Sequence, residues 1–330
     1  RYYKGSYTED DLCSDDAPAP ERTWILKTDE DGVSLLLESY KVGGDELYKL
    51  GGRPYLPLGT VTVQETKAPQ GYEIDPAVYV CHFTPDESGR KWISFDMTAT
   101  IPQAQVMGGV GIRKVDAEDG GTSPRGAASL DGATFAIYNA SEHDVTVDGT
   151  VYTPQTLEDV QAGTAQTIMT IEAHDGAATT DTDGDGADAS LPFGTYYLRE
   201  VASGNGYLLD DVVRTVEVRE AGAVAWCEDA CANQVIRGDV AFDKVYEDTK
   251  ATMPGVAFLV ESTTTHERHV VVTDATGHVD TSAAARPHAH RTNANDAAWD
   301  AATGTVDEAL LDADAGLWFY GNTEGTGEPN

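Results

Sequence analysis

Long apolar runs are missing from this sequence. No stretch of about 18 apolar residues occurs, and no basic start precedes an apolar segment, so neither a membrane-spanning helix nor a signal peptide is predicted. Basic residues are scarce too: 22 Lys and Arg stand against 56 Asp and Glu, a formal net charge of −34. Such a surface repels nucleic-acid phosphates and anionic lipids, so we expect no nucleic-acid binding and no membrane insertion by this segment.

Cysteines are few and fall into two groups, Cys13 with Cys81 and Cys227 with Cys231. They fit a secreted protein with disulfides, and three pairings are possible on paper. Cys227 and Cys231 could face each other across a hairpin with a three-residue loop. Zinc is disfavoured because C-x2-C pairs are absent.

No Ser-His-Asp, Cys-His or metal-hydrolase spacing stands out, so we expect no enzyme acting on an external substrate.

Two patterns could suggest a metal, and both are weak. The first imitates the start of a calcium loop, with acids at its first, third and fifth positions, Asp181, Asp183 and Asp185. Position twelve of that loop is Pro192 instead of Glu, which favours a solvated turn. The second pattern, His288 and His290, has no third ligand in sight. We therefore expect no metal and no cofactor.

A repeat organises the chain. LPLGTVTVQETKAPQGYEID (56–75) aligns without gaps to LPFGTYYLREVASGNGYLLD (191–210), with eight of twenty positions identical. The shared Leu-Pro-x-Gly-Thr resembles a wall-sorting tag with its last two letters transposed, but neither copy precedes an apolar run. A second recurrence pairs Val110–Lys114 with Val240–Lys244. Self-similarity in a chain of turns and alternating strands predicts repeated β-domains.

The repeats predict an all-β chain of tandem, immunoglobulin-like β-sandwich domains. Residues 107–237 hold one complete set of signals and are assigned to a complete domain. Residues 1–106 keep the later half and are assigned to the C-terminal part of a domain truncated at its start. Residues 238–330 keep only the beginning and are assigned to the N-terminal part of a further domain, truncated at its end.

Strand alternation places charged residues among apolar ones. Four strands show this: Val61, Val63 and Glu65; Val110, Ile112 and Lys114; Tyr196, Leu198 and Glu200; Val240, Phe242 and Lys244. An isolated buried ammonium or carboxylate costs several kcal/mol, so these groups must find partners or become neutral. The alternative is a strand-edge lysine whose stem is buried and whose ammonium reaches solvent.

These features resemble the Cna-B or SpaA type, prealbumin-like domains of Gram-positive surface proteins and pilins. Glu65-Thr-Lys-Ala-Pro-Gln-Gly-Tyr72 is similar to the E-box of that family, as is Tyr197-Leu-Arg-Glu200-Val with Gly206-Tyr207. Asp239-Val-Ala-Phe-Asp-Lys244 and the following Val256-Ala-Phe resemble surface-anchored proteins described as having VaFE repeats.

The resemblance implies a spontaneous isopeptide bond between Lys114 on the first strand and Asn233 on the last. Glu200 would be the assisting acid, hydrogen-bonding the side-chain carbonyl of Asn233 and moving protons as ammonia leaves. This is single-turnover self-modification and not enzymatic catalysis.

The flanking segments match less completely. Glu65 is the equivalent acid in residues 1–106, but the acceptor position holds Gln103, with Asp96 as a substitute. The first-strand lysine would lie before Arg1 unless Lys4 serves. Lys244 is the lysine of the next domain, and no E-box follows it.

The expected function is a structural stalk or adhesin segment, secreted and anchored at the cell wall of a Gram-positive bacterium. Its partners would be other domains of the same chain, and sortase acting on an anchor outside this segment. The alternative is a ligand-binding adhesin module that recognises host matrix protein or glycan.

Overall fold

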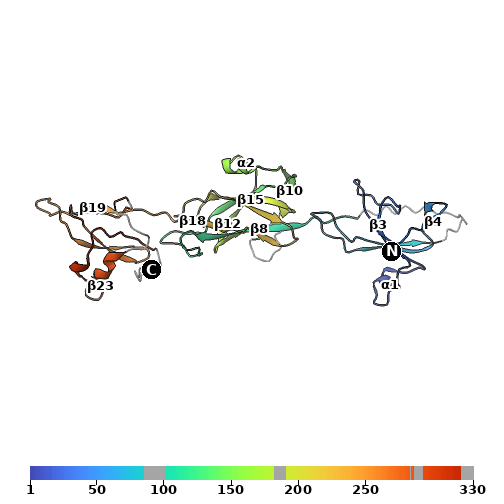
Figure 1. Cartoon of the computed structure of the whole chain (residues 1–330), viewed down its shortest axis with the longest axis horizontal. Coiled ribbons are helices and arrows are strands. Elements are labelled where there is room, and N and C mark those ends of the chain that lie inside the picture. Colours follow the sequence, from blue (N-terminus) through green and yellow to red (C-terminus); the bar gives the residue numbers. More distant parts are fainter. Residues whose placement is uncertain (85–100, 182–190, 283, 286–292, 321–330) are drawn as a thin grey trace. The chain divides into compact units, whose positions relative to one another are not determined.

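The structure is a computed structural model that describes residues 1–84, 101–181, 191–282, 284–285 and 293–320 (Figure 1). β-Strands joined by turns dominate these residues, and the few helices are one or two turns long. The predicted all-β class is confirmed. Two compact units divide the chain, unit 1 at Arg1–Val106 and unit 2 at Met107–Asn330. No helix among the described residues is long and apolar enough to cross a membrane.

Unit 1 is built on a small antiparallel sheet of order β1-β6-β7, with the hairpins β2-β3 and β4-β5. Its helix α1 starts with a capping box, because Thr8 and Asp11 each accept a hydrogen bond from the other's backbone amide. The elements in chain order are β1 (Tyr2–Tyr3), α1 (Glu9–Cys13), β2 (Trp24–Leu26), β3 (Lys41–Gly44), β4 (Lys49–Leu50), β5 (Arg53–Pro54), β6 (Gly59–Gln64) and β7 (Val78–Phe83).

Strand β6 departs from the predicted alternation. The pattern places Val63 inward and Thr60 outward, yet Val63 is 39% exposed and Thr60 is completely buried. The chain after β1 covers the other face of β6, since the Tyr7 amide donates to Thr60 Oγ1 and this hydroxyl donates to the Gly5 carbonyl. The prediction is therefore wrong for Thr60 and Val63, while Val61 is buried as expected. A buried threonine with both hydrogen bonds satisfied is a stable alternative to an inward valine.

Residues 107–237, called the middle domain below, form a β-sandwich. Strand β8 pairs with β13, β14, β17 and β18, while β9, β12, β15 and β16 form the facing layer, and β12 reaches both layers by pairing with β9 and β13. The elements are β8 (Met107–Asp116), β9 (Thr134–Asn139), β10 (Val145–Val147), β11 (Thr150–Tyr152), α2 (Leu157–Ala162), β12 (Thr167–His174), β13 (Ala177–Thr179), β14 (Leu191–Pro192), β15 (Gly194–Ala202), β16 (Val213–Val218), β17 (Val224–Trp226) and β18 (Cys231–Asn233).

Alternate residues of β8 and β15 point into the core of this sandwich, as the sequence predicts. Apolar side chains of both layers surround them, and each fully buried large side chain contributes about 1.5–3 kcal/mol. This burial offsets the cost of the charged groups placed in the same rows. The completely buried residues of the two strands include Val110, Ile112 and Lys114 on β8, and Tyr196, Leu198 and Glu200 on β15.

The last two strands of the middle domain do not form the expected hairpin. Both β17 and β18 run parallel to β8, so the chain from Cys227 to Cys231 continues in one direction along the same neighbour. The expected face-to-face placement of Cys227 and Cys231 is therefore wrong. All four cysteines are free thiols: Cys227 and Cys231 are buried, Cys81 is half-buried and Cys13 is exposed.

The end of β8 is tied to the loop after β15 by a buried hydrogen bond. The Tyr207 hydroxyl donates to Asp116 Oδ2 over 2.8 Å, and Asp116 is completely buried. Burial raises the pKa of the Tyr207 hydroxyl, so it keeps its proton and remains a donor. A backbone bridge from Tyr207 to Val235 extends the contact to the segment after β18.

Residues 238–320, called the last segment below, repeat the opening of the middle domain. The Lys244 amide donates to the Gly277 carbonyl as the Lys114 amide donates to the Gly176 carbonyl, both over 2.8 Å. Its elements are β19 (Ala241–Asp243), β20 (Ala257–Glu261), β21 (Arg268–Val272), β22 (His278–Asp280), the 3-10 helix η1 (Ala294–Ala298), β23 (Trp299–Asp300), β24 (Thr305–Val306) and the 3-10 helix η2 (Glu308–Leu310). The division assigned at residue 237 stays a prediction.

Strand β19 does not bury its predicted inward side chains as completely as β8 does. Val240 is 45% exposed, and Phe242 and Lys244 are only half-buried. Among the described residues β19 pairs with β22 alone, whereas β8 has partner strands along both edges. The prediction of a buried row at Val240, Phe242 and Lys244 is therefore wrong for Val240.

The last segment contains a buried charged cluster. His269 is completely buried between two carboxylates, with Nδ1 2.6 Å from Asp296 Oδ2 and Nε2 2.8 Å from Glu267 Oε1. Burial opposes a charged imidazole, but the hydrogen bonds to Asp296 and Glu267 outweigh it and raise the pKa of His269 to about 9. Both ring nitrogens therefore act as donors at neutral pH.

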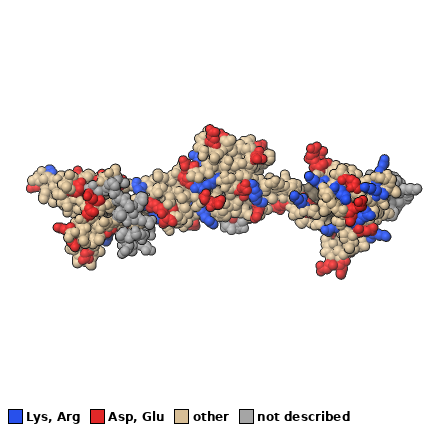
Figure 2. All heavy atoms as spheres, viewed as in Figure 1, with Lys and Arg blue, Asp and Glu red and all other residues tan. Residues whose placement is uncertain are grey.

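The acidic excess is distributed over the molecule. Figure 2 shows Asp and Glu side chains over both units on the face it presents, with Lys and Arg side chains among them. This arrangement fits a solvated, self-repelling surface.

Replacing Tyr207 by Phe should destabilise the middle domain. The change leaves the buried Asp116 carboxylate short of a donor, which costs about 1–3 kcal/mol. Urea unfolding of the full chain measures this loss. Tyr40→Phe is the matched control, because Tyr40 donates to Asp29 at an exposed site, and its loss should stay within about 0.5 kcal/mol. Equal losses in the two variants would contradict this prediction.

The stability of the last segment should fall in mild alkali. The pKa of His269 is raised from 6.5 to about 9 on folding. Its contribution is therefore complete below pH 6.5 and disappears as the pH rises through 9, with a limit of about 3 kcal/mol. Unfolding at pH 6, 7.5 and 9.5, compared with His269→Gln, measures it. A wild-type advantage that is constant over this range would refute the assignment.

Candidate functional site

The candidate site lies in the core of the middle domain and begins with Lys114. This lysine is completely buried near the end of β8, in the row that starts with Val110 and Ile112. Its Nζ atom has no hydrogen-bond partner among the described residues and lies 3.8 Å from Glu200 Oε1. Burial lowers the pKa of Lys114, although the neighbouring acidic groups oppose the shift. A lysine with a lowered pKa has a larger fraction of nucleophilic, neutral amine.

Glu200 and Asn233 complete the group. Strand β15 delivers Glu200 to the core, and β18 brings Asn233 beside β8, where both are at most 1% exposed. Asn233 Nδ2 donates to Glu200 Oε2 over 2.7 Å and to the Leu208 carbonyl over 2.7 Å. The structure therefore brings together Lys114, Glu200 and Asn233, the three residues that the sequence assigns to one site.

A shell of polar groups holds the acid in place. The Asp210 amide donates to Glu200 Oε2 over 2.7 Å, while the Asp210 carboxylate pairs with Arg214 over 2.7 Å. Burial raises the pKa of Asp210, but the hydrogen bonds from Arg214 and from the Val212 amide, together with the charge of Arg214, outweigh it and leave this pKa below its usual value. Asp210 thus stays ionised and fixes the loop that aims its amide at Glu200.

The orientation of Asn233 differs from the expected one. The resemblance implies that Glu200 hydrogen-bonds the side-chain carbonyl of Asn233, but Glu200 Oε2 accepts from the amide nitrogen. The carbonyl oxygen Oδ1 instead faces Cys231 Sγ at 3.1 Å. The Leu208 carbonyl fixes this orientation, because it can accept only from the NH2 group of Asn233.

The arrangement suits transfer of the Asn233 acyl group to the Lys114 amine. Glu200 lies between the amine, which must lose a proton, and the amide nitrogen, which must gain one. One carboxyl group in contact with both nitrogens can move that proton through its two oxygens. The fixed positions replace a bimolecular encounter by an intramolecular one.

Unit 1 reproduces half of this site. Glu65 Oε2 accepts from the Asp75 amide over 2.6 Å and from Gln103 Nε2 over 2.7 Å. Gln103 thus has the place of Asn233, and the bridge from Tyr72 to Gln105 matches that from Tyr207 to Val235. Asp96, the other acceptor considered, lies outside the described residues.

Lys4 does not have the place of Lys114 in unit 1. Strand β1 pairs with β6 through Tyr2 and Val61, as β9 pairs with β15 through Asn139 and Tyr196. The strand that contains Tyr2 is therefore equivalent to β9, and not to β8. Lys4 follows it directly and is exposed.

The metal candidates gain no support. Of the acidic loop only Asp181 is described, while Asp183 and Asp185, like His288 and His290, lie outside the described residues. Within the described part of the chain no group of three or more His, Cys, Asp and Glu side chains is placed to hold a metal ion.

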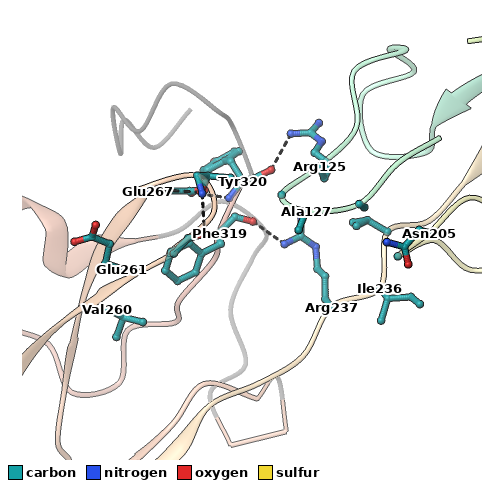
Figure 3. A pocket seen from close by; sticks show the side chains of 16 residues that line it. Arg125, Ala127, Asn205, Ile236, Arg237, Val260, Glu261, Glu267, Phe319 and Tyr320 are labelled. Atoms are coloured by element: carbon teal, nitrogen blue, oxygen red, sulfur yellow. Dashed lines mark hydrogen bonds between the residues drawn. The ribbon is translucent and has the colours of Figure 1, made fainter. Parts of the chain in front are cut away.

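A cavity of about 630 Å³ lies within unit 2, between the middle domain and the last segment. Figure 3 shows that the two arginines on its wall are engaged with the chain itself. Arg125 donates to the Tyr320 carbonyl over 3.2 Å, and Arg237 donates to the Phe319 carbonyl over 2.6 Å. Arg237 also pairs with Glu118 and stacks 3.7 Å above the Trp318 ring. These contacts use several of the donors that would otherwise recognise an anionic ligand.

Sequence reasoning missed three buried polar residues that the same patterns could have shown. Asp116 lies two residues after Lys114 on the same face of β8. Cys231 lies two residues before Asn233 on the same face of β18. His269, two residues after Glu267 in a β-strand, is a third instance. The signal in each instance is period-two alternation, applied to polar residues as well as to apolar ones.

Comparisons with known proteins agree with the fold. A family model described as SpaA, a prealbumin-like fold domain, matches residues 108–229. No curated protein matches this sequence. Among solved structures, the Bacillus anthracis TIE protein is 19% identical, covers 77% of this chain and 37% of its own, and has a TM-score of 0.47. The chain therefore spans little more than a third of that protein.

Two pilin structures are also similar. The Streptococcal ancillary pilin is 19% identical, covers 74% of this chain and 69% of its own, and has a TM-score of 0.26. The group B streptococcus pilus 2b backbone protein is 16% identical, covers 64% of this chain and 78% of its own, and has a TM-score of 0.26. The β-sandwich of the middle domain agrees with the match of residues 108–229 to the SpaA model of a prealbumin-like fold domain.

Proposed function

We propose that this chain is a structural segment of a Gram-positive surface protein, stiffened by an isopeptide bond that the middle domain forms between Lys114 and Asn233. One observation carries the proposal: an amine, an acid and a carboxamide are buried together, with the acid within 3.8 Å of the amine and 2.7 Å of the amide nitrogen. Burying these groups for stability alone is unfavourable, because apolar residues of similar volume would serve as well or better. Their use in a reaction accounts for their presence.

In the reaction the amine nitrogen of Lys114 replaces the amide nitrogen of Asn233 on the side-chain carbonyl carbon. The neutral amine of Lys114 attacks Asn233 Cγ, the bond from Cγ to Nδ2 breaks, and ammonia leaves. Glu200 takes the proton that the amine gives up and passes it to the leaving nitrogen. The acid ends as it began, while the lysine is consumed, so each molecule reacts once.

The bond would join the first strand of the middle domain to its last. Strands β8 and β18 run parallel and adjacent, with Lys114 opposite Cys231 and Asp116 opposite Asn233. A force applied to the two ends of this domain would reach a covalent link before it could peel the strands apart. This property suits a stalk that carries load between a cell surface and a target.

Location and partners follow from the proposed role. We place the protein outside the cell at the wall of a Gram-positive bacterium, held through sortase acting on an anchor outside this segment. Other domains of the same chain are its immediate partners. The family match supports this location through residues 108–229 only.

A second function, recognition of host matrix protein or glycan by an adhesin module, has the cavity within unit 2 as its strongest candidate surface. Its arginines already bind backbone carbonyls and carboxylates of the chain. That engagement favours a contact that fixes the last segment, and makes the structural role the better supported one.

Intact mass of the folded full chain tests the bond. Wild type should be lighter than its sequence by one ammonia, and peptide mapping should find Lys114 joined to Asn233. Glu200→Ala should keep the full mass, because the amine and the amide lose their proton carrier. A second missing ammonia is not expected, since Lys4 lies away from the Glu65 and Gln103 pair. Wild type at the full calculated mass would refute the proposal.

Replacing Lys114 should lower the free energy of unfolding by more than the loss of one side-chain contact would. Lys114→Met keeps most of the apolar volume and cannot form the bond, so the unfolded state regains the freedom of a loop of over 100 residues. The entropy model gives a loss of about 4–5 kcal/mol in the free energy of unfolding. Urea unfolding measures it, and Asn233→Ala should lose as much. Variants as stable as wild type would contradict the proposed cross-link.

A further inference from the structure

We propose that the thiol of Cys231 is a catalytic hydrogen-bond donor in the cross-linking reaction, where it stabilises the negative charge that develops on Asn233 Oδ1. This inference rests on the proposed function, since it assigns a role within the same reaction. It concerns the carbonyl oxygen, the one reacting atom that the Lys114 and Glu200 contacts leave unassigned.

The geometry places the thiol at that oxygen. Cys231 Sγ lies 3.1 Å from Asn233 Oδ1, within the range for a hydrogen bond from sulfur. The two residues are separated by one residue on β18, so their side chains share the face that looks into the core. Cys231 is completely buried and stands opposite Lys114 in the register with β8.

Glu200 is not placed for this role. Its Oε2 atom accepts from the amide nitrogen of Asn233 and from the Asp210 backbone amide. Its Oε1 atom has no hydrogen-bond partner in the described part of the chain and faces Lys114 Nζ. The acid therefore contacts the two nitrogens that exchange a proton, and the thiol contacts the oxygen.

The thiol retains its proton. Burial raises the pKa of Cys231, and the neighbouring Glu200 raises it further, so the sulfur is a donor and not a thiolate. The other acceptor within reach is Asp210 Oδ2 at 3.5 Å, which is already paired with Arg214 at 2.7 Å. The shorter contact, to Asn233, is the one that strengthens when charge develops on Oδ1.

The step is balanced without any further reactant. As Lys114 Nζ attacks Cγ, the electron pair of the carbonyl π bond moves to Oδ1 and the thiol hydrogen bond holds that charge. When the pair returns, the bond from Cγ to Nδ2 breaks and Nδ2 leaves as ammonia with the proton carried by Glu200. The sulfur ends in the thiol form in which it began.

Unit 1 provides a contrast at the equivalent acceptor. Gln103 donates to Glu65 as Asn233 donates to Glu200, yet its carbonyl oxygen is buried with no hydrogen-bond partner among the described residues. The residue two positions before Gln103 is Ile101, which has no donor. The acid contact thus recurs without the thiol, so the thiol contact is a separate feature of the middle domain.

The rate of ammonia loss tests the assignment. Full-length chain is dissolved from inclusion bodies in denaturant, where the site is not assembled, then refolded by dilution and followed by intact mass. Cys231→Ala and Cys231→Val both remove the donor, and each should slow the reaction about tenfold or more. Amide donors at developing oxyanions give about 10²–10³, and a thiol is the weaker donor. Cys231→Ser restores a donor and should react within about threefold of wild type.

Controls separate the role of the donor from packing. Cys227→Ala removes a buried thiol that has no contact with Asn233 described, and should react at the wild-type rate. Circular dichroism confirms that each variant reaches the folded state. Wild-type rates in both Cys231→Ala and Cys231→Val would overturn the assignment, and so would a Cys231→Ser variant as slow as these two. Wild type that never loses ammonia would overturn the proposed function itself, and the role of the thiol with it.

Discussion

The contact on which the middle domain depends is the burial of Lys114 against Glu200 and Asn233. Transfer of an ammonium and a carboxylate from water costs several kcal/mol each, and a separation of 3.8 Å between Nζ and Oε1 is too long for a strong ion pair to repay it. The apolar rows of β8 and β15 supply the compensating free energy. The rest of the sandwich surrounds these three side chains and keeps them buried.

The strands and loops around Lys114, Glu200 and Asn233 hold these three side chains in place. Strand β8 lies between β13 on one side and β17 and β18 on the other, so Lys114 is covered from both edges. The loop after β15 returns the Asp210 amide to Glu200, and the bond from Tyr207 to Asp116 fastens the same loop to the end of β8. Arg214 neutralises Asp210 without contacting the reacting atoms. These hydrogen bonds fix the positions of the loop and of Glu200 relative to β8.

The sequence was sufficient for the buried rows of the middle domain because alternation there is regular on both layers. It failed on β6, where the segment after β1 covers the face expected to meet solvent and makes Thr60 a core residue. It also failed between Cys227 and Cys231, because a short turn-rich stretch can reverse a strand or merely interrupt it. The parallel course of β17 and β18 depends on long-range pairing with β8, which local spacing does not encode.

Comparing Glu65 with Glu200 separates what the shared fold contributes to the site from what individual side chains contribute. Glu65 and Glu200 each accept from a backbone amide ten residues later and from a side-chain amide further along the chain, so the shared fold positions the acid. The differences lie in the added side chains: Asn233 where unit 1 has Gln103, a buried lysine beside the acid, and Cys231 at the carbonyl oxygen. Because the acid is common to both units, these three side chains are what the proposed cross-link adds to the shared arrangement in the middle domain.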